Sequence, residues 1–468
     1  MSTPNHQDDS RKVPKGILKK RKQASVRVKS DSDIILNESN KTDGHDEEEI
    51  RDISGGLTNK RADDDVVVDD DDVAESKARC AKKIYEDSAE VFYFLWKLLI
   101  AMMVVLICLL SFVVYLYFKS LPADYMPSPY SLPPPPRLEG ELEVNYKLER
   151  ATKFLEGLIV GPEFIIIKDD HLYTGTANGS VVEINDRGGI RVITNLGKPP
   201  CGMEFDADGF LIVCDAYLGI FKVDIVTGHS QLIVSPEPAL QSSLSPSSSS
   251  SSVRRTNFIN DLELDDDGNV YYTDSSVFER RDFVLDVLLL RYNAMTNRVE
   301  VLKGNLDFPN GILLSKYGDY ILISETSRAR ILKYYLKGIH LRQTYTFVDN
   351  LPCLPDNLQR TDRGTILVAC GNLRYDQKRF NFVDFLQEKI WLRALLMKLP
   401  IKPILGLIPH GSMLMEFSES GKVLKTMMDL QGATISHPSH AVEGRLGELG
   451  RKIFIGSYVN NYIGVIDL

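Results

Sequence analysis

The chain has 468 residues and a formal net charge of −9 at pH 7, and 43% of its residues are hydrophobic. This length allows a domain with a sizeable core together with further segments, and the acidic balance gives no reason to expect a nucleic-acid partner. Composition changes sharply along the chain and divides it into four parts, residues 1–90, 94–118, 119–140 and 141–468.

Residues 1–90 are polar and strongly charged. Cations gather between Arg11 and Lys29, and acidic residues dominate between Asp43 and Glu75. A segment of this composition buries too little apolar surface to fold, so we expect a disordered tail.

An uncharged apolar segment follows the tail. It runs from Leu98 to Phe118 between Lys97 and Lys119, which is long enough for a helix to cross about 30 Å of hydrocarbon. Its distance from the N-terminus favours an uncleaved signal anchor over residues 94–118. Basic residues are denser before it than after it, so the sequence predicts a single-pass type II protein of the endoplasmic reticulum, the plasma membrane or both. The tail would be cytosolic and the remainder lumenal or extracellular.

Two further features follow from this topology. Residues 119–140 are rich in proline from Tyr125 to Pro136, which predicts a stiff extended spacer that lifts the next domain off the bilayer. Asn178 lies in the sequence ANGS on a predicted turn outside the cytosol, so it is a candidate for glycosylation.

A repeated hairpin pattern fills residues 141–468. A strand, a polar turn with glycine and a more apolar strand recur in EFDADGFLIVCD, ELDDDGNVYYTD, LSKYGDYILIS and QRTDRGTILVAC. Repeats of roughly 45 residues built from short strands are typical of propeller blades. We therefore expect an all-β domain, a six-bladed β-propeller, with the helical-looking segment 380–409 as an insert.

Carboxylate and carboxamide side chains recur where apolar strands begin, in GPEF, FINDLEL, FPNGILL and LPDNLQR. Their spacing is about one or two repeats, as if successive blades supplied ligands to a shared metal ion. Oxygen ligands without His or Cys suit calcium rather than zinc. The alternative is that these residues only mark turns at strand entrances. The candidate ligands are Glu163, Asn260, Asn310, Asp356 and Asn357.

Four cysteines lie in the part predicted to face an oxidising compartment. Cys201 and Cys214 flank one hairpin turn at equal distances, and Cys353 and Cys370 straddle another about one residue out of register. Two cross-strand disulfides are expected, with buried free thiols as the alternative.

The insert 380–409 combines apolar and basic residues at helical spacing. Val383, Leu386 and Ile390 share one face, and Lys389 and Arg393 supply positive charge. Such a helix suits a membrane interface, a lid over the channel or a lipid or protein partner. A helix packed against the outside of a blade is the alternative.

The motifs GPEF, NDLELDDDGNVYYTDSS, FPNGILLS, LPDNL and IFIGSY resemble the strictosidine synthase-like group of six-bladed propellers. The resemblance covers the chain from about Leu142 to its C-terminus, and the wider superfamily includes paraoxonase, gluconolactonase and diisopropyl fluorophosphatase. In the paraoxonase and fluorophosphatase branches the corresponding residues surround a calcium ion in the central channel. The resemblance thus implies a Ca²⁺ site formed by the five candidate ligands, with Asp261 beside it.

Calcium in such a channel would favour hydrolysis of a small hydrophobic ester or lactone, or of a phosphotriester. Asp356 is the expected general base or nucleophile, because it has a carboxylate and is one of the five candidate ligands. Cys201 and Asp215 stand where paraoxonase has a His dyad, so a paraoxonase-style His mechanism is not expected. Residues 434–442 lack the Glu of strictosidine synthase, so alkaloid-forming condensation is not expected either. The alternative function is a non-catalytic propeller acting as an adaptor or receptor.

Overall fold

The computed structural model describes eight parts of the chain. The polar segment 1–69 lies outside them, so the predicted disorder of the tail stays a prediction there. The described residues are 70–119, 130–236, 240–241, 256, 258–275, 287–374, 382–396 and 410–468.

One long helix, α1 (Asp70–Phe118), contains the predicted span. Neither Pro nor Gly interrupts this stretch, and Arg79 pairs with Glu75 one turn away, which supports the polar first half. The helix therefore begins within the segment predicted to be irregular. Among the described residues α1 is the helix long and apolar enough to cross a membrane, judged by length and composition.

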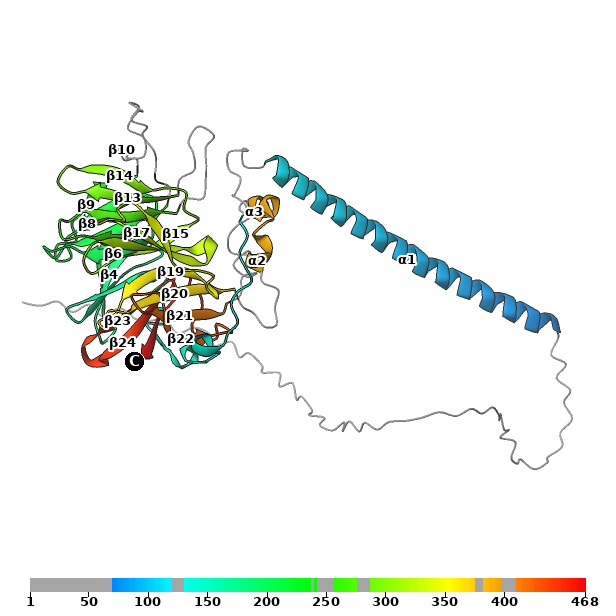
Figure 1. The fold of residues 1–468 in the computed structure, drawn as a ribbon. Coiled ribbons are helices and arrows are strands. Elements are labelled where there is room, and N and C mark those ends of the chain that lie inside the picture. Colours follow the sequence, from blue (N-terminus) through cyan, green and yellow to red (C-terminus); the bar gives the residue numbers. More distant parts are fainter. Residues whose placement is uncertain are drawn as a thin grey trace, which may run out of the picture. The chain divides into compact units, whose positions relative to one another are not determined.

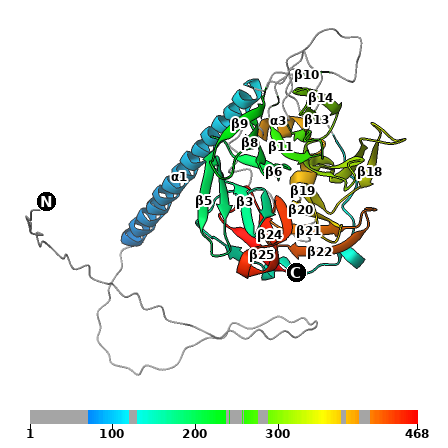
Figure 2. The same cartoon turned by 90° about the vertical axis from the view of Figure 1, so that its left-hand side faces the viewer.

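Six sheets surround a common centre, which confirms the six-bladed propeller (Figures 1 and 2). Their strand pairs are antiparallel, except that β10 pairs with β14 in parallel. The first blade contains β2 (Ile165–Lys168), β3 (His171–Gly175), β4 (Ser180–Ile184) and β5 (Ile190–Asn195). The second contains β6 (Pro200–Phe205), β7 (Leu211–Asp215), β8 (Gly219–Val223) and β9 (Ser230–Val234). The third contains β11 (Ile259–Leu264), β12 (Val270–Asp274), β13 (Leu288–Asn293) and β14 (Arg298–Lys303) with β10 (Leu240–Gln241).

The fourth to sixth blades follow the same plan, and we number the blades 1 to 6 in chain order. Blade 4 contains β15 (Pro309–Leu314), β16 (Tyr320–Glu325), β17 (Arg330–Tyr335) and β18 (Thr344–Val348). Blade 5 contains β19 (Cys353–Arg360), β20 (Ile366–Leu373), β21 (Ser412–Phe417) and β22 (Val423–Asp429). Blade 6 contains β23 (His440–Arg445), β24 (Arg451–Gly456) and β25 (Ile463–Asp467) with β1 (Thr152–Phe154).

Blade 6 closes the ring with strands from both ends of the domain. β1 pairs antiparallel with β25, with Thr152 opposite Val465 and Phe154 opposite Ile463. The pairing ties the two ends of the domain together within one sheet, in which β1 is the outermost strand. With three residues, β1 is too short to show a strand pattern in the sequence.

Apolar side chains from neighbouring sheets interlock to form the core between blades. Every residue of β16 is buried, whereas the outermost strand β9 is mostly half-buried or exposed. The innermost strand of each blade enters the channel at one end, which we call the entry end. The opposite end, where these strands leave the channel, is the exit end.

Two segments outside the blades pack on the propeller. Residues 130–138, which we call the strap, lie against it, and Leu132 and Leu138 contact the core of blades 4 and 5. The described part of the predicted spacer is thus docked rather than free-standing. In its described part, residues 382–396, the insert forms two short helices, α2 (Phe382–Leu386) and α3 (Ile390–Leu396), instead of one continuous helix. A turn separates them, and its Gln387 accepts a hydrogen bond from the Leu132 amide of the strap (2.6 Å).

Candidate metal centre

A β-bulge opens the innermost strand of blades 2 to 5 at the same place. In blade 4, Pro309 pairs with Glu325 and Ile312 with Ile323, so that two residues of β15 face one residue of β16. Bulges turn side chains out of the regular pleat and are common beside functional sites. The two residues in each bulge are Cys201 and Gly202, Asn260 and Asp261, Asn310 and Gly311, and Asp356 and Asn357.

Glycine in two of the bulges lets neighbouring innermost strands approach one another. A Cβ on Gly311 would lie 2.8 Å from the Asp356 carbonyl oxygen, and a Cβ on Gly202 would collide with Asp261. Four of the five predicted ligands therefore come from bulges in three successive blades. Glu163 joins them from the segment before β2, where the buried Ser439 hydroxyl donates to the Glu163 carbonyl oxygen (2.7 Å).

We call the five candidate ligands, Glu163, Asn260, Asn310, Asp356 and Asn357, the ring. The three amide oxygens of the ring have no hydrogen-bond partner. The side-chain Oδ1 atoms of Asn260, Asn310 and Asn357 are buried and unbonded, and the Asp356 Oδ1 atom is in the same state. The three asparagines are 4%, 5% and 2% exposed. Because a buried polar atom without a partner costs about 1–3 kcal/mol, four such oxygens near one place indicate a site for a ligand that accepts lone pairs.

Two carboxylates bring negative charge to the same place. Burial raises the pKa of Glu163 to about 7, and a hydrogen bond with Cys201 opposes the rise. Burial also raises the pKa of Asp356 well above its usual value, as does the charge of Glu163, while a hydrogen bond with Asn310 lowers it. The effect of Glu163 on the pKa of Asp356 shows that these two side chains lie within interaction range of one another.

Asp261, the expected neighbour of the ring, has a different role. Its Oδ1 atom accepts from the amide of Leu262 (2.8 Å) and its Oδ2 atom accepts from the amide of Ile312 (2.9 Å). Burial raises its pKa to about 8, and these two backbone hydrogen bonds oppose the rise. Each oxygen accepts a backbone hydrogen bond, so Asp261 joins blades 3 and 4.

The donor set fits calcium by its chemistry. Two carboxylates and three amide oxygens are hard ligands of the type calcium prefers. Among the described residues no group of three or more His, Cys, Asp and Glu side chains lies close enough to hold a metal. The proposed site has two such side chains, Glu163 and Asp356, and its other three ligands are asparagines.

The four cysteines of the propeller divide into one disulfide and two thiols. Cys353 and Cys370 are bonded across β19 and β20, as expected. Cys201 and Cys214 are buried and free. The bulge accounts for this error, because the extra residue in β6 breaks the register on which the expected pairing of Cys201 with Cys214 rests.

Cys201 lies at a position equivalent to the candidate ligands, but the sequence prediction omitted it because its side chain is a thiol and not an oxygen ligand. It occupies the first bulge position of blade 2, as Asn260 and Asn310 do in blades 3 and 4. Burial raises its pKa well above the usual range, and the neighbouring Glu163 adds to the rise. A thiol in this state is neutral. Aligning the repeats would have placed it in the ring.

Histidines near the ring are structural. The buried His440 stacks on Phe164, with 3.9 Å between ring centroids, and accepts from the Ile165 amide (3.3 Å). Burial lowers the pKa of His440 to about 3, so its imidazole is neutral at physiological pH. It holds blade 6 against blade 1. His437 contacts His410 (3.0 Å) and the Gly371 carbonyl oxygen (3.2 Å).

Two tyrosines stand close to the ring at the entry end. Burial raises the pKa of Tyr458 to about 12, and the charges of Asp356 and Glu163 add to this. Burial likewise raises the pKa of Tyr217, with contributions from Cys201, Asp215 and Glu163. Tyr217 packs edge-to-face on Phe258, 5.7 Å between centroids. Both phenols stay protonated near neutral pH and provide O–H donors beside the ring.

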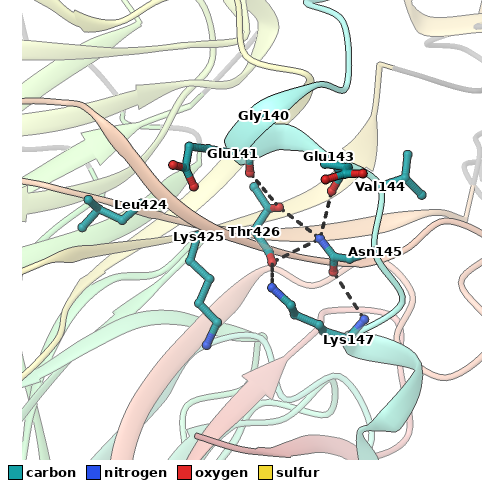
Figure 3. A pocket seen from close by; sticks show the side chains of 9 residues that line it. All are labelled: Gly140, Glu141, Glu143, Val144, Asn145, Lys147, Leu424, Lys425 and Thr426. Carbon is teal, nitrogen blue, oxygen red and sulfur yellow. Dashed lines mark hydrogen bonds between the residues drawn. The ribbon is translucent and has the colours of Figure 1, made fainter.

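A separate pocket of about 220 Å³ lies away from the ring, between residues 140–147 and β22 (Figure 3). The Asn145 amide group and the Lys147 ammonium group both donate to the Thr426 carbonyl oxygen, at 3.3 Å each. Its polar groups thus bond to one another and attach the chain before the propeller to blade 5.

Comparison with known proteins places the chain in a family. A family model described as strictosidine synthase matches residues 260–339, and one described as strictosidine synthase-like, N-terminal, matches residues 140–184. The adipocyte plasma membrane-associated protein of Danio rerio is 34% identical over 371 residues, which cover 74% of this chain and 85% of that protein. The chain belongs to the adipocyte plasma membrane-associated protein family. The Homo sapiens member is 32% identical over 367 residues, covering 73% of this chain and 83% of its own.

Solved structures with lower similarity are also propellers. A gluconolactonase from Xanthomonas campestris has a TM-score of 0.46 and 16% identity, covering 75% of this chain and 99% of its own. The calcium-binding protein regucalcin from Agrobacterium tumefaciens has a TM-score of 0.42 and 12% identity, covering 68% of this chain and 91% of its own. At these values we draw nothing about activity from either protein.

Proposed function

We propose that this membrane-associated family member is a calcium-dependent hydrolase of small hydrophobic esters or lactones, tethered to the bilayer by α1. The observation that carries the proposal is the set of four buried side-chain oxygens without partners, on Asn260, Asn310, Asp356 and Asn357. The carboxylate of Glu163 completes the set of oxygen ligands.

Electrostatics favours a cation at this ring. Glu163 and Asp356 raise one another's energy when both are ionised, because they are like charges in a poorly solvated place. A divalent cation bound between them would remove that repulsion and satisfy the amide oxygens. Calcium would supply Lewis-acid polarisation of a carbonyl oxygen.

The chain's own residues would perform the proton transfers. Asp356 would accept the proton of an attacking water, since its carboxylate lies in the ring. Tyr458 holds its phenolic proton beside Asp356 and Glu163 and would donate a hydrogen bond to the substrate. Tyr217 and Phe258 supply an aromatic surface for an apolar acyl or aryl group.

The membrane topology in this proposal is the one that the sequence predicts. The tail would face the cytosol and the propeller the lumen or cell exterior, as predicted for a type II protein. Asn178 is exposed on the turn between β3 and β4, where a glycan would have access.

Full-length protein in lipid nanodiscs provides the test of activity. The wild type should hydrolyse aryl esters or lactones with calcium and lose this activity with a chelator. Asp356→Asn keeps an oxygen ligand but removes the base, so kcat should fall by roughly a hundredfold or more while the melting temperature changes little. Asp267→Asn, on an exposed turn remote from the ring, is the matched control and should keep wild-type kcat.

The alternative function gives a different result. If the wild type shows no turnover above a calcium-only blank across esters, lactones and phosphotriesters, the hydrolase proposal fails. The ring would then be a structural ion site in an adaptor or receptor.

A further inference from the structure

The strap is held at its first described residue by two arginines. The Tyr130 ring lies 5.4 Å from the Arg328 guanidinium and 4.7 Å from that of Arg393. Arg328 belongs to the turn between β16 and β17, and Arg393 lies on α3. The strap therefore joins blade 4 to the insert of blade 5.

Hydrogen bonds to the strap backbone continue this attachment. Arg374, 2% exposed, donates to the carbonyl oxygens of Pro133 (2.5 Å) and Leu351 (3.0 Å). The Asn350 amide donates to the Pro134 carbonyl oxygen (2.9 Å). Charged donors that are buried against backbone oxygens give strong hydrogen bonds. This part of the strap is thus fixed to the propeller (Figure 1).

Strand direction shows which end of the propeller holds the strap. β19 begins at the entry end, and the antiparallel β20 returns there before Arg374 and the insert. β16 also ends at the entry end, next to Arg328. After Pro134 the chain descends to the outer edge of blade 5, where the Thr426 hydroxyl donates to the Glu141 carbonyl oxygen (3.2 Å). The strap thus reaches the propeller at the entry end first.

The chain between span and strap is short. Ten residues separate Lys119, just after α1, from Tyr130, and an extended chain between these two residues reaches at most about 40 Å. We propose that the strap holds the entry end of blades 4 and 5 against the same bilayer that α1 crosses, so that the channel opens toward lipid. The proposal does not depend on hydrolase activity.

The surface next to the strap has the chemistry of a membrane interface. Trp391 on α3 is 61% exposed and Phe385 on α2 is 37% exposed. Lys389 lies over the Phe385 ring at 4.0 Å, so cationic and apolar groups occur together. Tryptophan beside basic residues is typical of helices lying at the boundary between headgroups and acyl chains.

Exposed apolar side chains occur at both ends of the propeller, so they do not by themselves show which end faces the bilayer. Ile339 and Val226 lie in turns at the exit end and are 92% and 82% exposed. What distinguishes the entry end is the strap. Asn178 also lies at the entry end, on blade 1, and a glycan there would keep that blade clear of lipid, which is why we place the contact at blades 4 and 5.

The two tryptophans of the chain, Trp96 and Trp391, allow a direct test. Trp96→Phe leaves Trp391 as the single reporter in full-length protein reconstituted in phosphatidylcholine vesicles. Brominated acyl chains should reduce its emission by about half, because an interfacial indole contacts the quencher. The control carries Trp96→Phe, Trp391→Phe and Ile339→Trp, and its emission should change by less than about a tenth of that amount.

A second variant tests the strap itself. Tyr130→Ser with Leu132→Ser, in the Trp96→Phe background, should reduce the quenching of Trp391 while α1 keeps the protein in the vesicles. Equal quenching of the entry-end and exit-end reporters, or stronger quenching at the Ile339→Trp position, would overturn the proposal. These two reporters decide the question even if the strap variant does not fold.

Discussion

Glu163 and Asp356 are the residues on which the account of the ring depends. Each is a carboxylate with a raised pKa, and each raises the energy of the other's charged form. In the absence of a cation, protons relieve this repulsion. Protons and calcium should therefore compete for the ring, and stability should report on both.

The first prediction concerns pH. The pKa of Glu163 is about 7 in the folded chain, above its usual value. The stabilisation from its proton is complete below the unfolded pKa and is lost as the pH rises through about 7. Chelator-treated protein should thus lose about 2 kcal/mol of unfolding free energy between pH 5 and 8 relative to Glu163→Gln. Thermal unfolding across this range measures the difference, and parallel curves for the two proteins would contradict it.

Bulges are the elements that create the site. The candidate ligands can be predicted from the sequence because Asn and Asp recur before apolar strands, at intervals close to the repeat. The sequence does not reveal the bulge, which is a property of the pairing between two strands. That is why the Cys201–Cys214 pairing was wrong. The register also shows that Cys201 is equivalent to Asn260 and Asn310.

The second prediction concerns the close approach of β15 and β19. Gly311→Ala would place a methyl group 2.8 Å from the Asp356 carbonyl oxygen, so the strands must separate. We expect a loss of about 2–3 kcal/mol in unfolding free energy, as in overpacked cores, and weaker calcium binding.

Gly364→Ala serves as the control for Gly311→Ala. Its Cβ would meet no atom within 4 Å, although its φ of +78° is costly for alanine, at about 1 kcal/mol. Calcium affinity should be unchanged. If both substitutions weaken calcium binding equally, close packing at the bulge is not what positions the ring.

At the scale of the whole molecule, the sequence predicted the six blades, the apolar span and the ligand-bearing motifs because each has a local pattern. The closing strand β1 and the docked strap have none. Residues 152–154 and 130–138 acquire their roles through partners far along the chain, such as Val465 and Arg374. The single insert helix was wrong for the same reason, since the strap binds Gln387 at the turn between α2 and α3.

A third prediction tests the side of the membrane on which the propeller lies. Glycosidase should reduce the apparent mass of the cellular protein by one glycan, and Asn178→Gln should abolish that shift. The tail also carries two sequons, Asn37 in NES and Asn40 in NKT. A glycan on either of them instead would show that the tail is outside the cytosol.

Thermal unfolding of the full-length protein with calcium and with chelator tests the shared ion site most directly. Calcium binding to the folded state alone stabilises it by about 2.7 kcal/mol at a hundred times Kd. That corresponds to a rise of about 5 °C in the melting temperature, and Asp356→Ala should remove most of it. Identical melting of the wild type with calcium and with chelator would contradict the account of the ring as a calcium site.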